Sequence, residues 1–305
     1  MCSNIRPFLL VNNNKRVLEK IMRRYSSSTG SAQYETLAVS VPKKYVYHVE
    51  LNRPAKLNTF TPAMWKELST CFSTLSETPE CRVIVLSGQG KHFTGGIDLN
   101  GFIENASKAH ELSDVARKAR FLSYLIKEYQ DGITALENCV KPVLAVVHNA
   151  CVGAGVDLIT AADIRYCTEE AWFQVKEVDV GLAADVGTLQ RLPKVIGSAS
   201  IARELCFTAR KVPSKEALDI GLVSKVFSDK DSAIKEVLEV AQTIASKSPV
   251  AVQVTKQSLV YSQSRPTCEG LEHIRLLNMT MLQSDDLSKA AISQATKTEA
   301  EFDDL

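Results

Sequence analysis

Two hydrophobic periods alternate along the chain from residue 35 onward. Strand-like segments, alternating or wholly apolar, occupy residues 37–41, 46–51, 82–87 and 142–148. Helical periodicity lies between and after them, at residues 61–75, 113–139 and 154–162. Strands that alternate with helices over about 200 residues predict an α/β fold rather than an all-helical one.

The strand pattern stops after Val226. The remaining segments with an apolar stripe at helical spacing are residues 232–246, 249–262, 268–283 and 287–302. We therefore expect an α/β core over residues 34–231 and a helical C-terminal region over residues 232–305.

The first 33 residues differ from the rest in composition. Residues 1–30 contain six Arg or Lys residues against one acid, Glu19, and a short serine run follows Arg23 and Arg24. This composition predicts a mitochondrial transit peptide and hence a matrix protein, although a plain basic tail is the alternative. The last residues, FDDL, do not form a peroxisomal Ser-Lys-Leu signal.

Overall composition limits the classes of function. The 305 residues are 45% hydrophobic and carry a formal net charge of +1, so a general polyanion binder is not indicated. We expect no nucleic-acid partner. No apolar run reaches the roughly 18 residues of a membrane span. The eight cysteines are scattered without metal-ligand spacing, so we expect no metal site.

A glycine-bearing turn, Gly153-Ala154-Gly155, joins a strand to a helix. Leu158 stands where a dinucleotide-binding motif requires its third glycine. The better interpretation is an anion site, because the first N–H groups of a helix are unpaired. A second donor could come from the GGIDL segment at residues 95–99. Each turn taken alone is more often plain structure.

Three acids lie on or after this helix. Asp157 shares a helix face with Ala154, while Glu177 and Asp185 follow in the next 30 or so residues. A carboxyl group held in apolar surroundings can act as a base or an acid near neutral pH. The plainer alternatives are a surface ion pair for Glu177 and a helix N-cap for Asp185.

Three blocks of sequence resemble a known family. Residues 51–58 (LNRPAKLN), 92–99 (HFTGGIDL) and 141–158 resemble the successive signatures of the crotonase, or enoyl-CoA hydratase/isomerase, family. The resemblance covers residue 35 to the C-terminus. It implies a spiral of ββα units, helical C-terminal segments that build a homotrimer or homohexamer, and an acyl-CoA thioester substrate. No cofactor is implied, because coenzyme A is part of the substrate.

Residues 163–197 are more similar still to the 3,5- to 2,4-dienoyl-CoA isomerases of that family. In that subfamily an aspartate, a glutamate and a second aspartate line the pocket, and they correspond to Asp157, Glu177 and Asp185. Enoyl-CoA hydratases usually have glutamate at the position of Asp157 and glycine at that of Asp185. The resemblance thus favours an isomerase of unsaturated fatty acid β-oxidation.

The resemblance also assigns binding roles. The backbone N–H groups of Ile97 and Ala154 would form an oxyanion hole, with Ala154 a departure from the family's usual glycine. Residues implied to contact coenzyme A or the acyl group are Arg53, Lys56, Leu57, Gly95, Gly96, Asp98 and Gly153.

The chemistry that follows is a proton transfer from C2 to C6 of the acyl chain. We expect Asp185 to take the C2 proton, Glu177 to deliver one to C6, and Asp157 to tune the pair or orient the substrate. The alternatives are an enoyl-CoA hydratase, a 3,2-enoyl-CoA isomerase and an RNA-binding protein with a silent pocket. The last would need the basic cluster formed by Lys108, Arg117, Lys118, Arg120 and Lys127.

Overall fold

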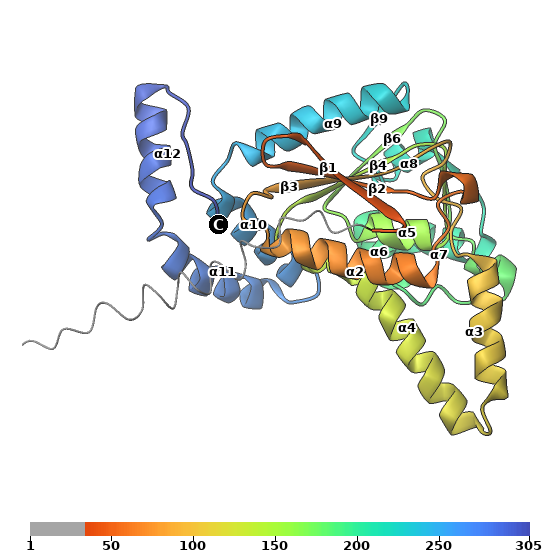
Figure 1. Ribbon diagram of the computed structural model, residues 1–305. Coiled ribbons are helices and arrows are strands. Elements are labelled where there is room, and N and C mark those ends of the chain that lie inside the picture. The colour runs from red at the N-terminus through yellow and green to blue at the C-terminus, as the bar shows by residue number, and fades with distance from the viewer. Residues whose placement is uncertain (1–33) are drawn as a thin grey trace, which may run out of the picture. The chain divides into compact units, whose positions relative to one another are not determined.

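The computed structural model describes residues 34–305, so the expected transit peptide, residues 1–33, lies outside the described residues. The main sheet has six strands in the order β1-β2-β3-β4-β6-β9, and only β1 and β2 pair antiparallel (Figure 1). These strands are β1 (Leu37–Lys43), β2 (Val46–Leu51), β3 (Val83–Gly88), β4 (Val143–Val147), β6 (Ile164–Thr168) and β9 (Lys225–Phe227).

A second, smaller sheet forms where the chain leaves the first. It consists of β5 (Ala150–Val152), β7 (Trp172–Gln174) and β8 (Val212–Pro213). Strand β5 begins three residues after β4 ends and pairs with β7 in parallel. The chain therefore passes from one sheet to the other at the carboxyl end of β4, and the predicted α/β class is confirmed.

Helices follow the strands and then continue alone to the C-terminus. They are α2 (Pro62–Glu77), α3 (Leu99–Glu111), α4 (Val115–Asn138), α5 (Ala154–Thr160), α6 (Thr188–Val195), α7 (Ala199–Thr208), α8 (Ser214–Asp219), α9 (Lys230–Ala245), α10 (Pro249–Ser262), α11 (Thr267–Met281) and α12 (Asp285–Thr296), with 3₁₀ turns η1 (Pro54–Lys56) and η2 (Glu177–Val180). Helix α2 begins where its sequence predicts, since Thr61 accepts a hydrogen bond from the Met64 N–H and Pro62 needs no partner for its nitrogen.

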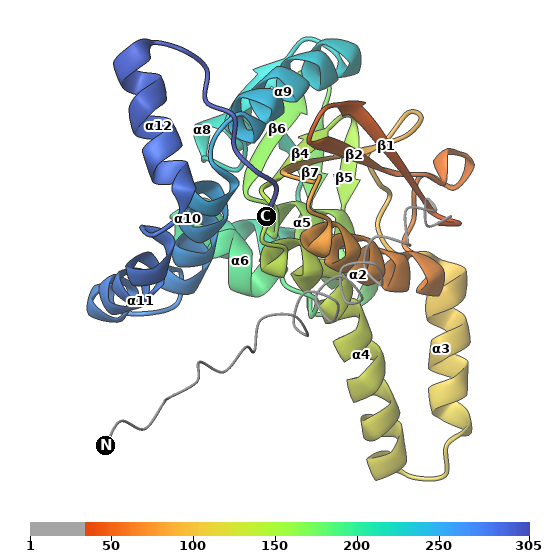
Figure 2. The same cartoon turned by 60° about the vertical axis from the view of Figure 1, so that its left-hand side comes forward.

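The core lies on both faces of the parallel sheet. Every residue of β3 and β4 is buried. Helix α9 covers one face, and α2 and α5 lie on the other side (Figures 1 and 2). The fully buried residues of α9 are Val237 and three alanines, Ala233, Ala241 and Ala245, whose small side chains permit close packing on the sheet. Helix α9 thus belongs to the packed core, although the predicted boundary after residue 231 assigns nearly all of it to the C-terminal region.

Two helical segments differ from the sequence pattern. Helix α3 is not predicted, although Leu99, Phe102 and Ala106 form an apolar stripe at helical spacing; this stripe lines a cavity, and only Ala109 is buried within the protein. The prediction of a helix over residues 287–302 is wrong beyond Thr296. Lys297 takes a left-handed conformation there, and the buried Arg82 guanidinium holds the following segment by donating to the carbonyl of Phe302 at 2.7 Å.

Candidate active site

A cavity of about 740 Å³ opens beside the first turn of α5. Nine of the twelve residues expected at the site line it, namely Gly95, Gly96, Ile97, Asp98, Gly153, Ala154, Asp157, Glu177 and Asp185. Arg53, Lys56 and Leu57 do not line it. Segments separated by about 90 residues of chain are therefore brought to one cavity by the turn from the main sheet into the second.

The two glycine turns run side by side. Thr94 pairs with Cys151 in a parallel bridge. Ile97 lies three residues after Thr94, and Ala154 lies three residues after Cys151. The approach is close at Gly96, where φ is +93° and an added Cβ would lie 2.9 Å from the carbonyl oxygen of Val152. Only glycine fits there without moving the backbone.

The amide directions follow from the bonds around them. The Gly96 carbonyl accepts from the Phe60 N–H at 2.9 Å, and in a trans peptide the next N–H, that of Ile97, points the opposite way. The Gly153 carbonyl accepts from Val156 N–H at 2.7 Å, which directs the Ala154 N–H away from the helix. Within residues 34–305 neither N–H donates a hydrogen bond. Two donors are thus available at the cavity wall.

Glu177 begins η2 and faces the Gly153 turn. Its Oε1 would lie 3.3 Å from a Cβ at Gly153, and its Oε2 is buried without a hydrogen-bond partner. Burial, and then the negative charges of Asp157 and Asp185, raise the pKa of Glu177 to about 7. Glu177 forms no ion pair among the described residues, so the alternative of a surface salt bridge is wrong.

Asp157 is fully buried and joins two helices. Its Oδ1 accepts from the backbone N–H of Thr188 at 2.5 Å, and Thr188 is the first residue of α6. Its Oδ2 has no partner within the described chain. Burial raises the pKa of Asp157 to about 6 despite the Thr188 hydrogen bonds, and the charge of Asp185 adds to the rise.

Asp185 lies on the connection between η2 and α6. Its carbonyl accepts a 2.8 Å hydrogen bond from the side chain of Gln130 on α4, and partial burial raises its pKa. The N-cap of α6 is Gly187, which offers no side chain, so the alternative of Asp185 as an N-cap is wrong. Gln130 and Thr188 were not expected at the site, and nothing in the local sequence signals contacts across 55 and 31 residues.

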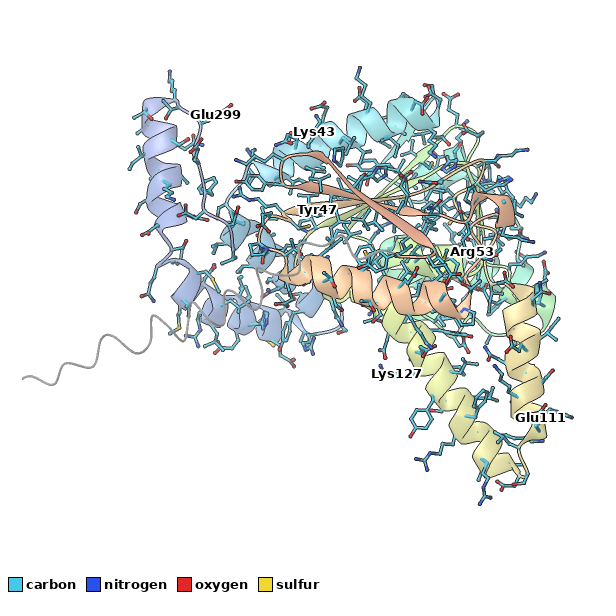
Figure 3. All side chains as sticks on the ribbon, viewed as in Figure 1. Lys43, Tyr47, Arg53, Glu111, Lys127 and Glu299 are labelled. Carbon is cyan, nitrogen blue, oxygen red and sulfur yellow. The ribbon has the colours of Figure 1, made fainter. Side chains whose placement is uncertain are left out.

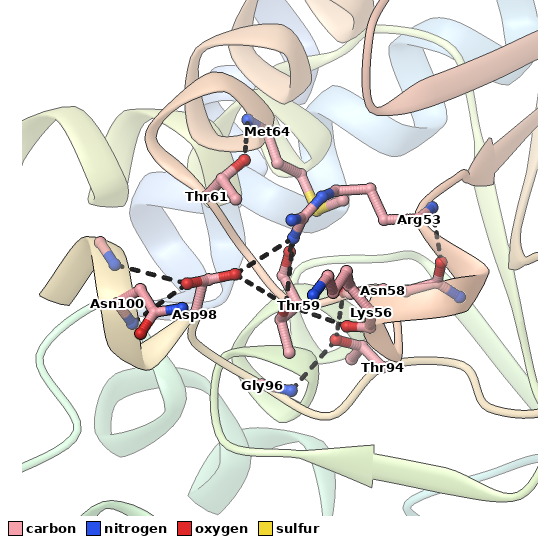
Figure 4. A network of polar contacts seen from close by, with 11 residues as sticks. Arg53, Lys56, Asn58, Thr59, Thr61, Met64, Thr94, Gly96, Asp98 and Asn100 are labelled. Atoms are coloured by element: carbon pink, nitrogen blue, oxygen red, sulfur yellow. Dashed lines mark hydrogen bonds and ion pairs between the residues drawn. The ribbon is translucent and has the colours of Figure 1, made fainter.

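Arg53 and Asp98 pair with each other at the edge of the cavity (Figure 4). The Arg53 guanidinium donates to the carbonyl of Thr59 at 2.6 Å and to Asp98 at 3.4 Å. Asp98 also caps α3 by accepting from the N–H groups of Asn100 and Gly101. Burial alone would raise the pKa of Asp98, but these hydrogen bonds outweigh it and lower the pKa. The pair thus anchors the loop that carries Ile97, and the Arg53 side chain, just past the end of β2 (Figure 3), is 20% exposed.

Other classes of site receive little support within residues 34–305. No group of three or more His, Cys, Asp or Glu side chains there could hold a metal ion. None of the helices in that range has the length and apolar character needed to cross a bilayer. In the basic cluster, Lys108, Arg117 and Lys127 are each engaged by a neighbouring acid, which reduces the charge available to a polyanion.

Comparisons with known proteins place the chain in a family. The enoyl-CoA hydratase/isomerase family matches residues 42–304. A mitochondrial Delta(3,5)-Delta(2,4)-dienoyl-CoA isomerase of Rattus norvegicus is 49% identical over 92% of this chain and 86% of its own length. The enzyme of the same name from Homo sapiens is 51% identical over 88% of this chain and 81% of its own length.

Solved structures agree on the fold. The crystal structure of an enoyl-CoA hydratase from Bacillus anthracis superposes with a TM-score of 0.79, at 23% identity, over 88% of this chain and 99% of the other. The crotonase-type spiral implied by the sequence signatures is thereby confirmed. The chain belongs to the enoyl-CoA hydratase/isomerase family.

Proposed function

We propose that this protein is a dienoyl-CoA isomerase, which converts a 3,5-dienoyl-CoA thioester to the 2,4-dienoyl-CoA in the β-oxidation of unsaturated fatty acids. The observation that carries the proposal is one cavity that holds Asp157, Glu177 and Asp185 beside the unpaired N–H groups of Ile97 and Ala154. The names of the rat and human relatives agree with it.

The reaction starts at C2 of the acyl chain. Its protons are acidic because the carbanion is stabilised by both the carbonyl and the diene. Asp185 accepts one of them, and negative charge spreads from the thioester oxygen to C6. The N–H groups of Ile97 and Ala154 donate to that oxygen, and loss of one such donor typically costs about 10² to 10³ in rate.

Protonation at C6 completes the isomerisation. C2 and C6 are too far apart for one small carboxylate to reach both, so a second acid is needed. Glu177 suits this role, because a pKa of about 7 leaves much of it protonated near neutral pH. Asp157 raises that pKa and ties α5 to α6, which holds the segment of Asp185. One proton leaves and one returns, so no redox cofactor enters the scheme.

The remainder of the cavity suits the acyl chain. Apolar side chains of α3 and α4 line it, among them Phe102, Leu122, Leu125 and Ile126. The nucleotide part of coenzyme A would lie outside, near Arg53, Lys56 and Leu57. This placement rests on the family signatures, since these three residues stand beside the cavity and not in its wall.

The proposed assembly is a homotrimer or a homohexamer. Helices α10, α11 and α12 leave large apolar side chains more than half exposed, including Leu259, Leu271, Met279 and Ile292. Apolar surface of this extent is typical of an interface between subunits. The proposed location is the mitochondrial matrix, in line with the rat and human relatives and with the basic residues before residue 34.

The test is ultraviolet monitoring of 3,5-dienoyl-CoA, whose product has a longer conjugated system and absorbs differently. We expect turnover by the wild type and a loss of at least about 10²-fold in kcat for Asp185→Asn and for Glu177→Gln. Asp179→Asn is the matched control, because Asp179 lies in the same 3₁₀ turn as Glu177 but pairs with Lys176 at the surface.

The outcomes separate the alternatives. Full activity of either site variant refutes the role assigned to that residue. Water addition to a 2-enoyl-CoA without diene isomerisation indicates a hydratase, and transposition of a 3-enoyl-CoA alone indicates a 3,2-enoyl-CoA isomerase. Salt-sensitive RNA retention with no turnover of any thioester indicates a binding protein.

A further inference from the structure

Thr94 lies between the two donor turns and takes no part in the steps above. It is completely buried and belongs to the segment that connects β3 to α3. It does not line the cavity, so it cannot contact the substrate. Its contacts nevertheless reach both turns.

The hydroxyl group acts on the Ile97 turn. Thr94 Oγ1 accepts from the Gly96 N–H at 3.1 Å and donates to the carbonyl of Asn58 at 2.8 Å (Figure 4). The Gly96 carbonyl is held on its other side by the Phe60 N–H. With both ends of Gly96 bonded, the peptide plane that carries the Ile97 N–H has a fixed direction.

Asn58 gives the hydroxyl a rigid base. The Asn58 amide nitrogen donates to the carbonyls of Gln89 and His92 at 2.8 and 2.9 Å, and its Oδ1 accepts from the Arg53 N–H at 2.8 Å. Asn58 is itself completely buried. The hydroxyl of Thr94 therefore links the backbone carbonyl of Asn58, which is held in place, to the N–H of Gly96, the residue before the Ile97 donor.

The backbone and the methyl group of Thr94 act on the Ala154 turn. Its N–H donates to the carbonyl of Ala150 at 3.0 Å, and its carbonyl accepts from the Val152 N–H at 3.3 Å. Its Cγ2 would lie 2.4 Å from a Cβ at Gly155, so the methyl packs against the first turn of α5. The Thr94 side chain thus contacts Gly96, which precedes the Ile97 donor, and Gly155, which follows the Ala154 donor.

We propose that Thr94 is a positioning residue whose hydroxyl sets the direction of the Ile97 N–H relative to the Ala154 N–H, while the backbone of Thr94 holds the turn that carries the Ala154 N–H. The inference deepens the proposed function, because it rests on a thioester oxygen bound between these donors. A displacement of about 1 Å at such a site can cost roughly 10² in rate.

Two variants separate the two groups of the side chain. Thr94→Val keeps the shape and removes the hydroxyl, which leaves the buried Gly96 N–H and Asn58 carbonyl unpaired. We expect its kcat to fall about 10- to 100-fold, with KM changed less than about threefold. Thr94→Ser keeps the hydroxyl and removes the methyl, and we expect it to retain kcat within about fivefold.

Thr168→Val is the matched control. Thr168 is also completely buried, but its Oγ1 has no hydrogen-bond partner within residues 34–305, and it lies on β6 away from the cavity. The same chemical change there should leave kcat unaltered. If Thr168→Val lowers kcat as much as Thr94→Val does, the loss comes from disturbed packing in general, and this result counts against the proposal.

The decisive readout is the absorption spectrum of bound 2,4-dienoyl-CoA. Two hydrogen bonds polarise its carbonyl and shift its absorption to longer wavelength. We expect this shift to shrink in Thr94→Val and to persist in Thr94→Ser. An unchanged shift in Thr94→Val, or a shift lost equally in Thr94→Ser, overturns the proposal. The measurement needs binding and no turnover, so it remains valid if the wild type fails to isomerise 3,5-dienoyl-CoA and the proposed function falls.

Discussion

The raised pKa of Glu177 suits the proposed proton transfer, but it also destabilises the folded protein at high pH. Its pKa of about 7 exceeds the ordinary 4.5, so the folded protein binds this proton more tightly than the unfolded chain does. The folded state is therefore favoured at low pH, and that contribution is lost as the pH rises toward and through about 7. Glu177→Gln keeps the shape of the neutral acid and removes the titration.

The magnitude follows from the two pKa values. Each tenfold change in proton affinity corresponds to about 1.4 kcal/mol, which gives an upper limit of about 3 kcal/mol well above pH 7. Between about pH 5 and pH 8.5 we expect Glu177→Gln to gain roughly 2 kcal/mol in free energy of unfolding relative to the wild type. The gain arises because the wild type must ionise a buried group beside Asp157 and Asp185.

The assay is urea unfolding of both proteins at the two pH values and at one protein concentration. Glu216→Gln is a control of opposite sign. Glu216 pairs with Arg210 at 2.6 Å, and hydrogen bonds from Arg210 lower its pKa, so its replacement should destabilise the protein at the higher pH and matter less at the lower. If Glu177→Gln is no more stable than the wild type at about pH 8.5, the argument that burial raises the pKa of Glu177 is wrong.

Three further predictions concern the turns, the third acid and the C-terminal segment. Gly153→Ala places a Cβ 3.3 Å from Glu177 Oε1 at a φ of +53°. Steady-state kinetics should show kcat reduced at least about tenfold. A kcat equal to that of the wild type would contradict the close approach of Glu177 to the Gly153 turn. Asp157→Asn removes a charge that raises the pKa of Glu177, so the ionisation of Glu177 in the pH profile of kcat should move to lower pH, and an unmoved profile would deny that coupling. Arg82→Ala deletes the donors to Phe302 and Asp304, so limited proteolysis should cleave after α12 faster than in the wild type, and equal rates would show that Arg82 does not hold this segment.

Local pattern alone determined much of the fold. Buried strands appear as apolar runs because both of their faces are covered, and α2 begins at Thr61 because a cap and a proline satisfy its first turn. Pattern does not show that the apolar stripe of α3 lines a cavity instead of packing into the core. It also fails where a distant group decides the end of an element. The segment after Thr296 leaves its helix and is held by Arg82, which lies 220 residues away from Phe302 along the chain.

The same division applies to the site. The sequence determined which residues are present, since the signatures supplied three acids and two glycine turns in a family-like order. Only the tertiary structure decided their properties. The pKa of Glu177 depends on burial and on charges brought from other segments, and the Ile97 and Ala154 amides become neighbours through the bridge between Thr94 and Cys151. Electrostatic energies and donor directions depend on distances in space, and a one-dimensional pattern records only spacing along the chain.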